Sequence, residues 1–500
     1  MVKFVNMRLV IFILALTSLL ISFLGSPKAS LYSTIMQFDL SKIQEYFSVH
    51  DEYFRPPDTS LRFLLFSVSV LLLMFVTKPS IRSNYNDSLS MSYISVACIG
   101  VFYVSFLLSN NIYNYAAIIL VLLSIFHLLF RNENILRPSE KFFIFSFILM
   151  FYLPMISILF HNTSINELDN YFRFLLITPL FFLVKSSKLT LENILLILNI
   201  SGIISSLYGL FLFLDSGNYR IRGYTSSATI YSNILAIYFL ISLISFFYFS
   251  GKNKYISLLC TILTAFIVII ASSRASLITL IFIAFFLLLS NHRKQMFKFS
   301  KTAILISTLI GLTSLSFSNI PTRILNSYDS AYNYINNNSG HFWQHKDSIV
   351  PRLIIWKGSL NMIKEYPVIG VGLSNFNKEL INQIENGSIL PIRPGVSDLS
   401  AGINHAHNQY FDMFAKLGLA GFVAICLFII ISYWFFNSYK NSNSRDILFI
   451  SLIGKIIILM YAFNMLFHVI LSHQQSTLFM ITTIVIFAGL LSKTSSEKNV

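Results

Sequence analysis

Apolar runs long enough to cross a membrane recur along the whole chain. A helix that crosses a hydrocarbon core of about 30 Å needs roughly 17 to 25 mostly apolar residues. Runs of that kind lie near residues 8–25, 61–77, 92–108, 113–130, 142–160, 192–214, 229–250, 302–318, 409–433, 447–467 and 476–491. Shorter runs lie near residues 171–185, 256–272 and 275–290. Composition agrees, because 55% of the residues are apolar and 11% are charged, against roughly 45 to 50% and about 25% in soluble domains. The sequence therefore predicts an all-α, polytopic integral membrane protein with about twelve to fourteen transmembrane helices.

The lysine and arginine residues of the short loops predict the orientation of the chain, because cytoplasmic loops carry an excess of them. If every run spans, one side of the membrane receives Lys3, Arg8, Lys78, Arg82, Arg131, Arg137, Lys141, Lys185, Lys188, Lys252, Lys254, Arg293, Lys294, Lys298, Lys301, Lys440, Arg445, Lys493 and Lys498. Both termini are then cytoplasmic. The net charge of +15 reflects the basic residues of the cytoplasmic loops. Because these residues are spread over many short loops, we expect no nucleic-acid partner.

One long polar segment, near residues 319–406, falls on the outer face and divides the chain into three parts. We expect N-terminal transmembrane helices over residues 1–200 and a central unit over residues 201–435 that includes this loop. C-terminal transmembrane helices and a short cytoplasmic tail follow over residues 436–500.

The outer loop itself divides into two parts. Residues 319–347 have weak periodicity and several turn formers, which predicts a partly irregular segment. Residues 352–365 have helical periodicity, and Pro367 and Gly370 end the helix. The predicted apolar stripe of this helix consists of Ile355, Trp356, Leu360 and Ile363. Such a helix can lie along a membrane surface.

A few arginines depart from the basic bias and fall on the outer face: Arg220, Arg222, Arg274, Arg323 and Arg352. A cation at membrane depth is costly and tends to have a specific partner. Arg274 stands out, because it lies in the sequence Ser-Ser-Arg-Ala-Ser between two closely spaced apolar runs. Snorkelling to lipid phosphates is the alternative role, chiefly for Arg220, Arg222 and Arg323. A guanidinium also suits a phosphorylated lipid, since it stays charged and donates two hydrogen bonds to phosphate oxygens.

Two histidines, His405 and His407, precede Asn408 and a long apolar run. A neutral imidazole at such a helix start can take a proton from a hydroxyl near neutral pH, as a general base does. The alternative is that both histidines only cap the helix or form hydrogen bonds at the boundary.

The other outer histidines carry less information. We expect His468 and His473, before the last run, to have structural or interfacial roles. His341 and His345 are four residues apart and suit one face of a helix, but no third metal ligand lies nearby. The chain has only 21 Asp plus Glu residues and no Asp-x-Asp pair on the outer side, so we expect no metal and no cofactor.

Three motifs together resemble the O-antigen ligase superfamily, which also contains O-antigen polymerase-like proteins. The first is Arg274 in Ser-Ser-Arg-Ala-Ser. The second runs from Arg352-Leu-Ile-Ile-Trp356 into Tyr-Pro-Val-Ile-Gly-Val-Gly-Leu-Ser-Asn-Phe at residues 366–376. The third is His405-Ala-His-Asn-Gln-Tyr, in which His407 and Asn408 begin the pattern His-Asn-x9-Gly-x-x-Gly that ends at Gly421. The resemblance covers about residues 220–421.

The resemblance implies a multi-span glycosyltransferase of the bacterial inner membrane whose active site faces the periplasm, so that residues 319–406 form a periplasmic loop. Its donor would be a glycan on undecaprenyl diphosphate, and its acceptor lipid A-core or another glycan. Arg274 and Arg352 would bind the diphosphate, and His407 would deprotonate or orient the acceptor hydroxyl. Further candidates for substrate binding are Arg220, Arg222, His405, Asn408 and Trp356.

Three activities stay open at this point. The His-Asn-x9-Gly-x-x-Gly pattern favours a ligase that attaches O-polysaccharide to lipid A-core, although polymerase-like members share much of it. A polymerase of O-antigen or another surface polysaccharide is the second possibility. A transporter of lipid-linked glycans is more remote, because no internal repeat is evident.

Overall fold

The computed structural model describes residues 88–109, 111–130, 136–161, 165–217, 220–271, 273–289, 320–336, 349–392 and 402–497. Within these residues the fold is all-α, as predicted. The predicted spans near 8–25, 61–77 and 302–318 lie outside the described residues, as do His341 and His345.

The helices follow one another with short connections. In chain order they are α5 (Ser88–Ser105), α6 (Ile112–Phe130), α7 (Pro138–His161), α8 (Asp169–Ser186), α9 (Leu191–Ser216), α10 (Ala228–Tyr248), α11 (Gly251–Ile270), α12 (Arg274–Leu289), α14 (Ile320–Ile335), α15 (Ile349–Glu365), α16 (Phe376–Glu385), α17 (Gln409–Asn437), α18 (Arg445–Asn464) and α19 (Gln474–Glu497). Short 3-10 helices cover Ile165–Leu168 and Ile470–Ser472.

Seven of the described helices are long and apolar enough to cross a membrane: Pro138–Ile158, Leu191–Ser216, Ala228–Tyr248, Gly251–Ile270, Gln409–Asn437, Arg445–Asn464 and Gln474–Glu497. Three shorter apolar helices cover Tyr93–Ser105, Ile112–Leu128 and Arg274–Ile283. The chain is therefore a polytopic membrane protein. The total of twelve to fourteen spans includes runs outside the described residues and stays a prediction.

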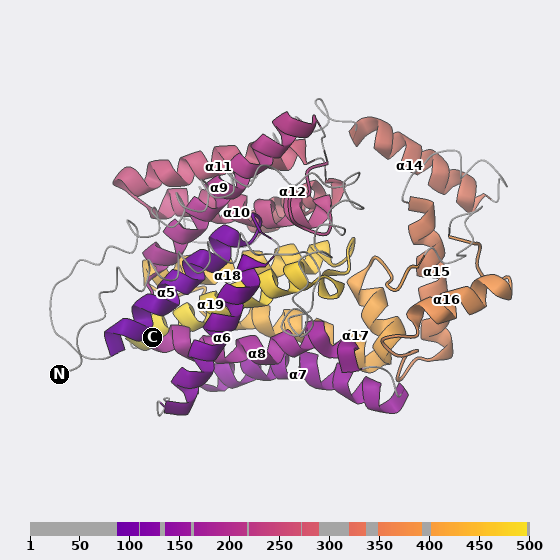
Figure 1. Cartoon of the computed structure of the whole chain (residues 1–500), viewed down its shortest axis with the longest axis horizontal. Helices are drawn as coiled ribbons and strands as arrows, with labels where there is room; N and C mark the ends of the chain where they lie inside the picture. The colour runs from indigo at the N-terminus through magenta and orange to yellow at the C-terminus, as the bar shows by residue number, and fades with distance from the viewer. Residues whose placement is uncertain are drawn as a thin grey trace, which may run out of the picture.

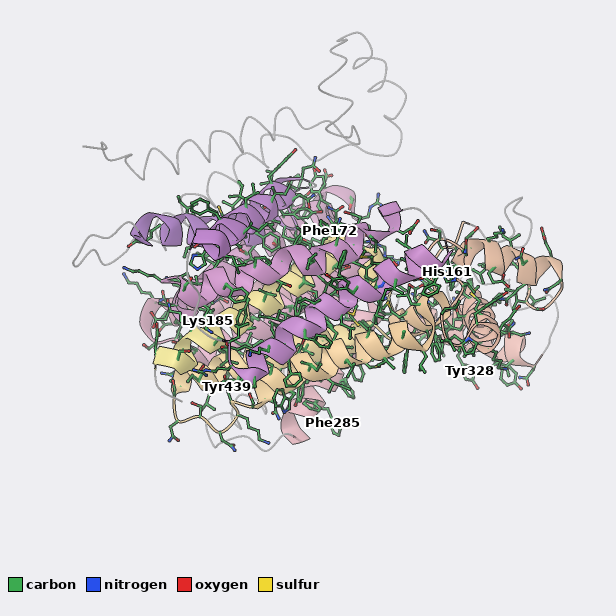
Figure 2. All side chains as sticks on the ribbon, turned by 90° about the horizontal axis from the view of Figure 1, so that it is seen from below. His161, Phe172, Lys185, Phe285, Tyr328 and Tyr439 are labelled. Atoms are coloured by element: carbon green, nitrogen blue, oxygen red, sulfur yellow. The ribbon has the colours of Figure 1, made fainter. Side chains whose placement is uncertain are left out.

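The long helices run side by side, while α14, α15 and α16 gather at one end of this bundle (Figure 1). We call that end the loop end. The C-terminus lies at the opposite end (Figure 1). Figure 2 shows Lys185 and Tyr439 at the opposite end, and His161 and Tyr328 towards the loop end.

The centre of the bundle is α19. It packs against α8 and α18, and every residue of its most apolar stretch is buried inside the protein. The ring of Phe479 lies 5.7 Å from that of Tyr103, 5.0 Å from that of Phe106 and 5.7 Å from that of Tyr238. Edge-on aromatic contacts of this kind favour one packed arrangement of the helices.

A break in α17 separates the loop end from the rest of the bundle. Gly418 has non-helical backbone angles (φ 66°, ψ −160°). The backbone N–H of Leu419 donates to the carbonyl oxygen of Pro367 at 2.8 Å, and that of Gly372 donates to Lys416 at 2.9 Å. A Cβ atom on Gly418 would lie 2.1 Å from the carbonyl oxygen of Val368. Only glycine fits this conformation and this contact, so the run predicted as one span is present but is kinked.

The helices beyond the break share a small core of their own. It consists of Val350, Ile354, Ile355, Met362, Val371, Phe376, Leu380, Ile384, Ile389, Ile392, Ala406 and Ala415. Residues 320–335, in the segment expected to be partly irregular, form the helix α14, and residues 337–347 of that segment lie outside the described residues. Within the predicted apolar stripe of α15, Ile355 is buried and Leu360 is 43% exposed, because the buried face of α15 runs through Gly358 and Ser359.

Candidate active site

The start of α17 carries the histidine turn at residues 405–408. Asn408 is the N-cap, and its Oδ1 accepts hydrogen bonds from the backbone N–H groups of Tyr410 at 2.9 Å and Phe411 at 3.1 Å. Its Nδ2 donates to the carbonyl oxygen of Leu466 at 3.1 Å. An Asn at this position satisfies two of the free N–H groups of a helix start. Asn408 therefore fixes the direction in which the preceding histidines leave the helix.

The backbone of His407 has a positive φ of 53°, unlike that of any other non-glycine residue in the described ranges. Such a conformation is uncommon for a bulky residue and tends to mark functional sites. The N–H of His407 donates to Nδ1 of His405 at 3.4 Å. The two rings meet edge to face, with centroids 4.3 Å apart.

The peptide between the two histidines is held from both sides. Nε1 of Trp356 donates to the carbonyl oxygen of Ala406 at 2.9 Å. The N–H of Ala406 donates to Oδ1 of Asp412 at 2.9 Å, and Lys416 lies 3.1 Å from the same carboxylate oxygen. Through Trp356, α15 fixes the histidine turn, which explains why these two distant motifs occur together.

Two further histidines lie beside the turn, although the sequence suggested only structural or interfacial roles for them. The ring of His473 lies 6.1 Å from that of His405 and 4.7 Å from that of His468. The Nε2 atoms of His468 and His473 are buried without a hydrogen-bond partner. No spacing signal could have shown this cluster, because its members come from two loops that only the fold brings together.

Burial and neighbouring cations keep these imidazoles neutral. Burial lowers the pKa of His407 from 6.5 to about 3, and the nearby rings of His405 and His473 and the charge of Arg352 act in the same direction. Burial, followed by the charge of Lys416, lowers the pKa of His405 to about 4. A neutral imidazole has one ring nitrogen free to accept a proton.

Arg352 lies near the start of α15, and its positive charge acts on His405, His407 and His468. The structure thus brings together four residues that the sequence singled out: His405, His407, Arg352 and Trp356.

The other candidate arginines lie on neighbouring elements of the loop end. Arg274 opens α12, and its Nη1 donates to Oγ of Ser327 in α14 at 2.6 Å. One turn further along α12, Thr279 donates to Oδ1 of Asn464, the last residue of α18, at 3.0 Å. Arg220 and Arg222 are exposed in the segment between α9 and α10.

We also searched the described part of the chain for groups of metal-ligating side chains. Within it, no three His, Cys, Asp or Glu side chains are arranged to hold a metal ion.

The fold and the site define a polytopic membrane protein with neutral imidazoles and an arginine at one end of its helix bundle. Residues 259–426 match the family model described as O-antigen ligase. The matched segment includes Arg274, Arg352, the histidine turn and the kink at Gly418, and this match supports the O-antigen ligase superfamily. The resemblance seen in the sequence is thereby confirmed.

The similarity to one relative covers more of the chain. It is described as an uncharacterized protein of Haemophilus influenzae and is 24% identical over 402 residues. The aligned part makes up 78% of this chain and 96% of the relative. The similarity thus extends well beyond the O-antigen ligase domain.

Proposed function

We propose that the chain is a glycosyltransferase that moves a glycan from undecaprenyl diphosphate to an acceptor hydroxyl, on the periplasmic face of the bacterial inner membrane. The observation that carries this proposal is the placement of the strained, neutral His407 within reach of the charge of Arg352. A base and a cation side by side are what a sugar transfer from a diphosphate requires, because a proton must be taken up and negative charge must be stabilised.

The proposed reaction is a single displacement. The acceptor oxygen attacks the anomeric carbon of the glycan while the bond from that carbon to the diphosphate oxygen breaks. His407 takes the hydroxyl proton, and the leaving diphosphate carries its negative charge to Arg352 and Arg274. Arg222 and Arg220 contribute to phosphate binding from the neighbouring segment. A single displacement inverts the configuration at the anomeric carbon.

The low pKa of His407 in the empty site has a consequence for this reaction. A base with a pKa of about 3 is weak at neutral pH. The negative charge of a bound diphosphate opposes the effect of Arg352 and raises the pKa of the ring. Binding of the donor therefore makes His407 a stronger base than it is in the empty site.

Among the activities of this superfamily we propose ligase activity, the attachment of O-polysaccharide to lipid A-core. The pattern that begins at His407 and Asn408 supports it. Gly418 within that pattern serves the kink of α17, so this part of the pattern reflects backbone architecture. Polymerase activity is therefore the second candidate, and transport of lipid-linked glycans is a more remote one.

The test is the glycolipid banding pattern of a deletion strain that carries either the wild-type gene or the His407→Ala variant. For a ligase, the variant strain lacks all O-chain bands on the core and accumulates long lipid-linked polymer. For a polymerase, the core carries a single repeat. We expect turnover to fall by about 100- to 10,000-fold in purified His407→Ala enzyme. Unchanged transfer by this variant would contradict the assignment of the base and favour transport.

A further inference from the structure

The loop between α18 and α19, residues 465–473, supports the start of α17. The backbone N–H of Gln409 donates to the carbonyl oxygen of Met465 at 2.8 Å. The N–H of Leu471 donates to Oε1 of Gln409 at 2.8 Å, and Asn408 reaches Leu466 as described above. The histidine turn is therefore anchored to this loop.

His473, at the end of this loop, and Gln475, at the start of α19, form hydrogen bonds to the segment between α9 and α10. Nδ1 of His473 lies 3.1 Å from Oγ of Ser226. Oε1 of Gln475 accepts from the N–H of Ser226 at 3.3 Å, and its Nε2 donates to the carbonyl oxygen of Tyr224 at 2.9 Å. Gln475 is 9% exposed, so both ends of a buried amide serve to hold this one short segment.

That segment is joined tightly to Arg222. The backbone N–H and the hydroxyl of Thr225 both donate to the carbonyl oxygen of Arg222, at 3.0 and 2.6 Å. Gly223 has a φ of 51°, and a Cβ atom there would lie 2.9 Å from the ring of Tyr231. The backbone of Arg222 is thus fixed, while its side chain is exposed.

We propose that His473 and Gln475 are positioning residues that hold the Arg222 turn beside the histidine turn, so that the Arg222 guanidinium reaches the diphosphate of the donor. This inference rests on the proposed function. His473 links the two parts directly, because its ring contacts Ser226 on one side and faces His405 on the other. Both the Arg222 turn and His473 with Gln475 lie outside residues 259–426, which match the family model.

The experiment measures the binding of undecaprenyl diphosphate, the leaving group of the proposed reaction, to the purified full-length chain in lipid nanodiscs. We expect Arg222→Ala to raise the dissociation constant by about tenfold. His473→Ala and Gln475→Ala each remove hydrogen bonds to the turn and raise it by about fivefold. In the Arg222→Ala background, the same two substitutions have no further effect, because there is no guanidinium left to position.

Gln474→Ala is the matched control for Gln475→Ala. Gln474 is exposed, and its Nε2 donates to Oδ1 of Asn114 at 3.0 Å, so its substitution leaves the dissociation constant unchanged. The thermal midpoint of every variant shows that the compared proteins are folded. Ser226→Ala combined with His473→Ala gives no more than the effect of either alone, because both remove the same bond.

Two other outcomes separate this inference from the proposed function. Full additivity of His473→Ala or Gln475→Ala with Arg222→Ala would overturn the positioning role, while the diphosphate site would stand. Unchanged binding in Arg222→Ala and also in Arg352→Ala would overturn the proposed diphosphate site itself.

Discussion

At the opposite end of the bundle, a lysine pairs with a buried carboxylate, whereas at the loop end a cation acts on neutral imidazoles. Glu140 is fully buried, and its Oε2 accepts from Nζ of Lys185 at 2.9 Å and from the N–H of Arg137 at 3.0 Å. The Arg137 guanidinium also donates to Ser495 and Tyr439. At the loop end, Asp412 is paired with Lys416, and the charge of Arg352 reaches the histidines.

This difference distinguishes charged residues that stabilise the fold from charged residues that are available to bind a substrate. A buried ion is costly unless another group of the protein compensates it, and Glu140 has such compensation from Lys185 and from the backbone N–H of Arg137. The imidazoles avoid the cost by staying neutral, at the expense of stability in acid. The loop end is thus left with a cation suited to an anionic substrate, whereas Lys185 at the opposite end is already paired with Glu140.

The largest expected effect is on stability, at the opposite end. Lys185→Met leaves the carboxylate of Glu140 buried without its lysine, which costs about 3 to 5 kcal/mol of unfolding free energy. Turnover by the folded enzyme stays unchanged. Equilibrium unfolding in mixed micelles measures the first quantity and a glycan-transfer assay the second. Lys188→Met, at an exposed lysine three residues further on, serves as control and stays within about 0.5 kcal/mol of wild type.

The next effect is on catalysis, at the loop end. Arg352→Lys keeps the positive charge but loses the planar fork that binds two phosphate oxygens. We expect turnover to fall by about 100-fold, with little change in thermal midpoint. Arg445→Lys is the matched control, since Arg445 donates to the carbonyl oxygens of Phe247 and Tyr248 at the opposite end. Equal loss of turnover in both variants would erase the distinction between the two ends.

The smallest effect is a difference in the pH dependence of stability. The pKa of His405 is about 4 in the folded protein, below its ordinary value of 6.5. Between these values the unfolded chain binds a proton that the folded chain does not, so stability falls as the pH drops from 6.5 towards 4. His405→Gln removes this group, and the unfolding midpoint should decline less steeply with acidification. Parallel curves for wild type and variant would contradict the burial of a neutral His405.

Much of the bundle could be predicted from the sequence, because the length of an apolar run is a local property. The run near 192–214 is α9, and the run near 229–250 is α10. The kink at Gly418 could not be predicted from the sequence, because it depends on a contact with Pro367 and Val368. The buried face of α15 depends in the same way on a contact outside the helix, because Gly358 packs against the side chain of Leu380 in α16.

The candidate site was predictable only where its residues are neighbours in sequence. The turn of His405, His407 and Asn408 could be predicted as a helix start, and the cap bonds of Asn408 agree with it. The place of His473 beside His405 could not, because it requires the α18–α19 loop to fold against the start of α17. A histidine in a polar turn has the same local pattern whether or not it joins a site.

The central position of α19 has a consequence for how the enzyme is made. α19 follows every other described helix in chain order, yet it fills the middle of the bundle. The ribosome delivers the surrounding helices to the membrane before their common partner exists. The loop that supports both the histidine turn and the Arg222 turn emerges at the same late moment. A chain that ends before α19 therefore lacks both the helix that fills the bundle and the loop that supports the two turns, so we expect it to be inactive.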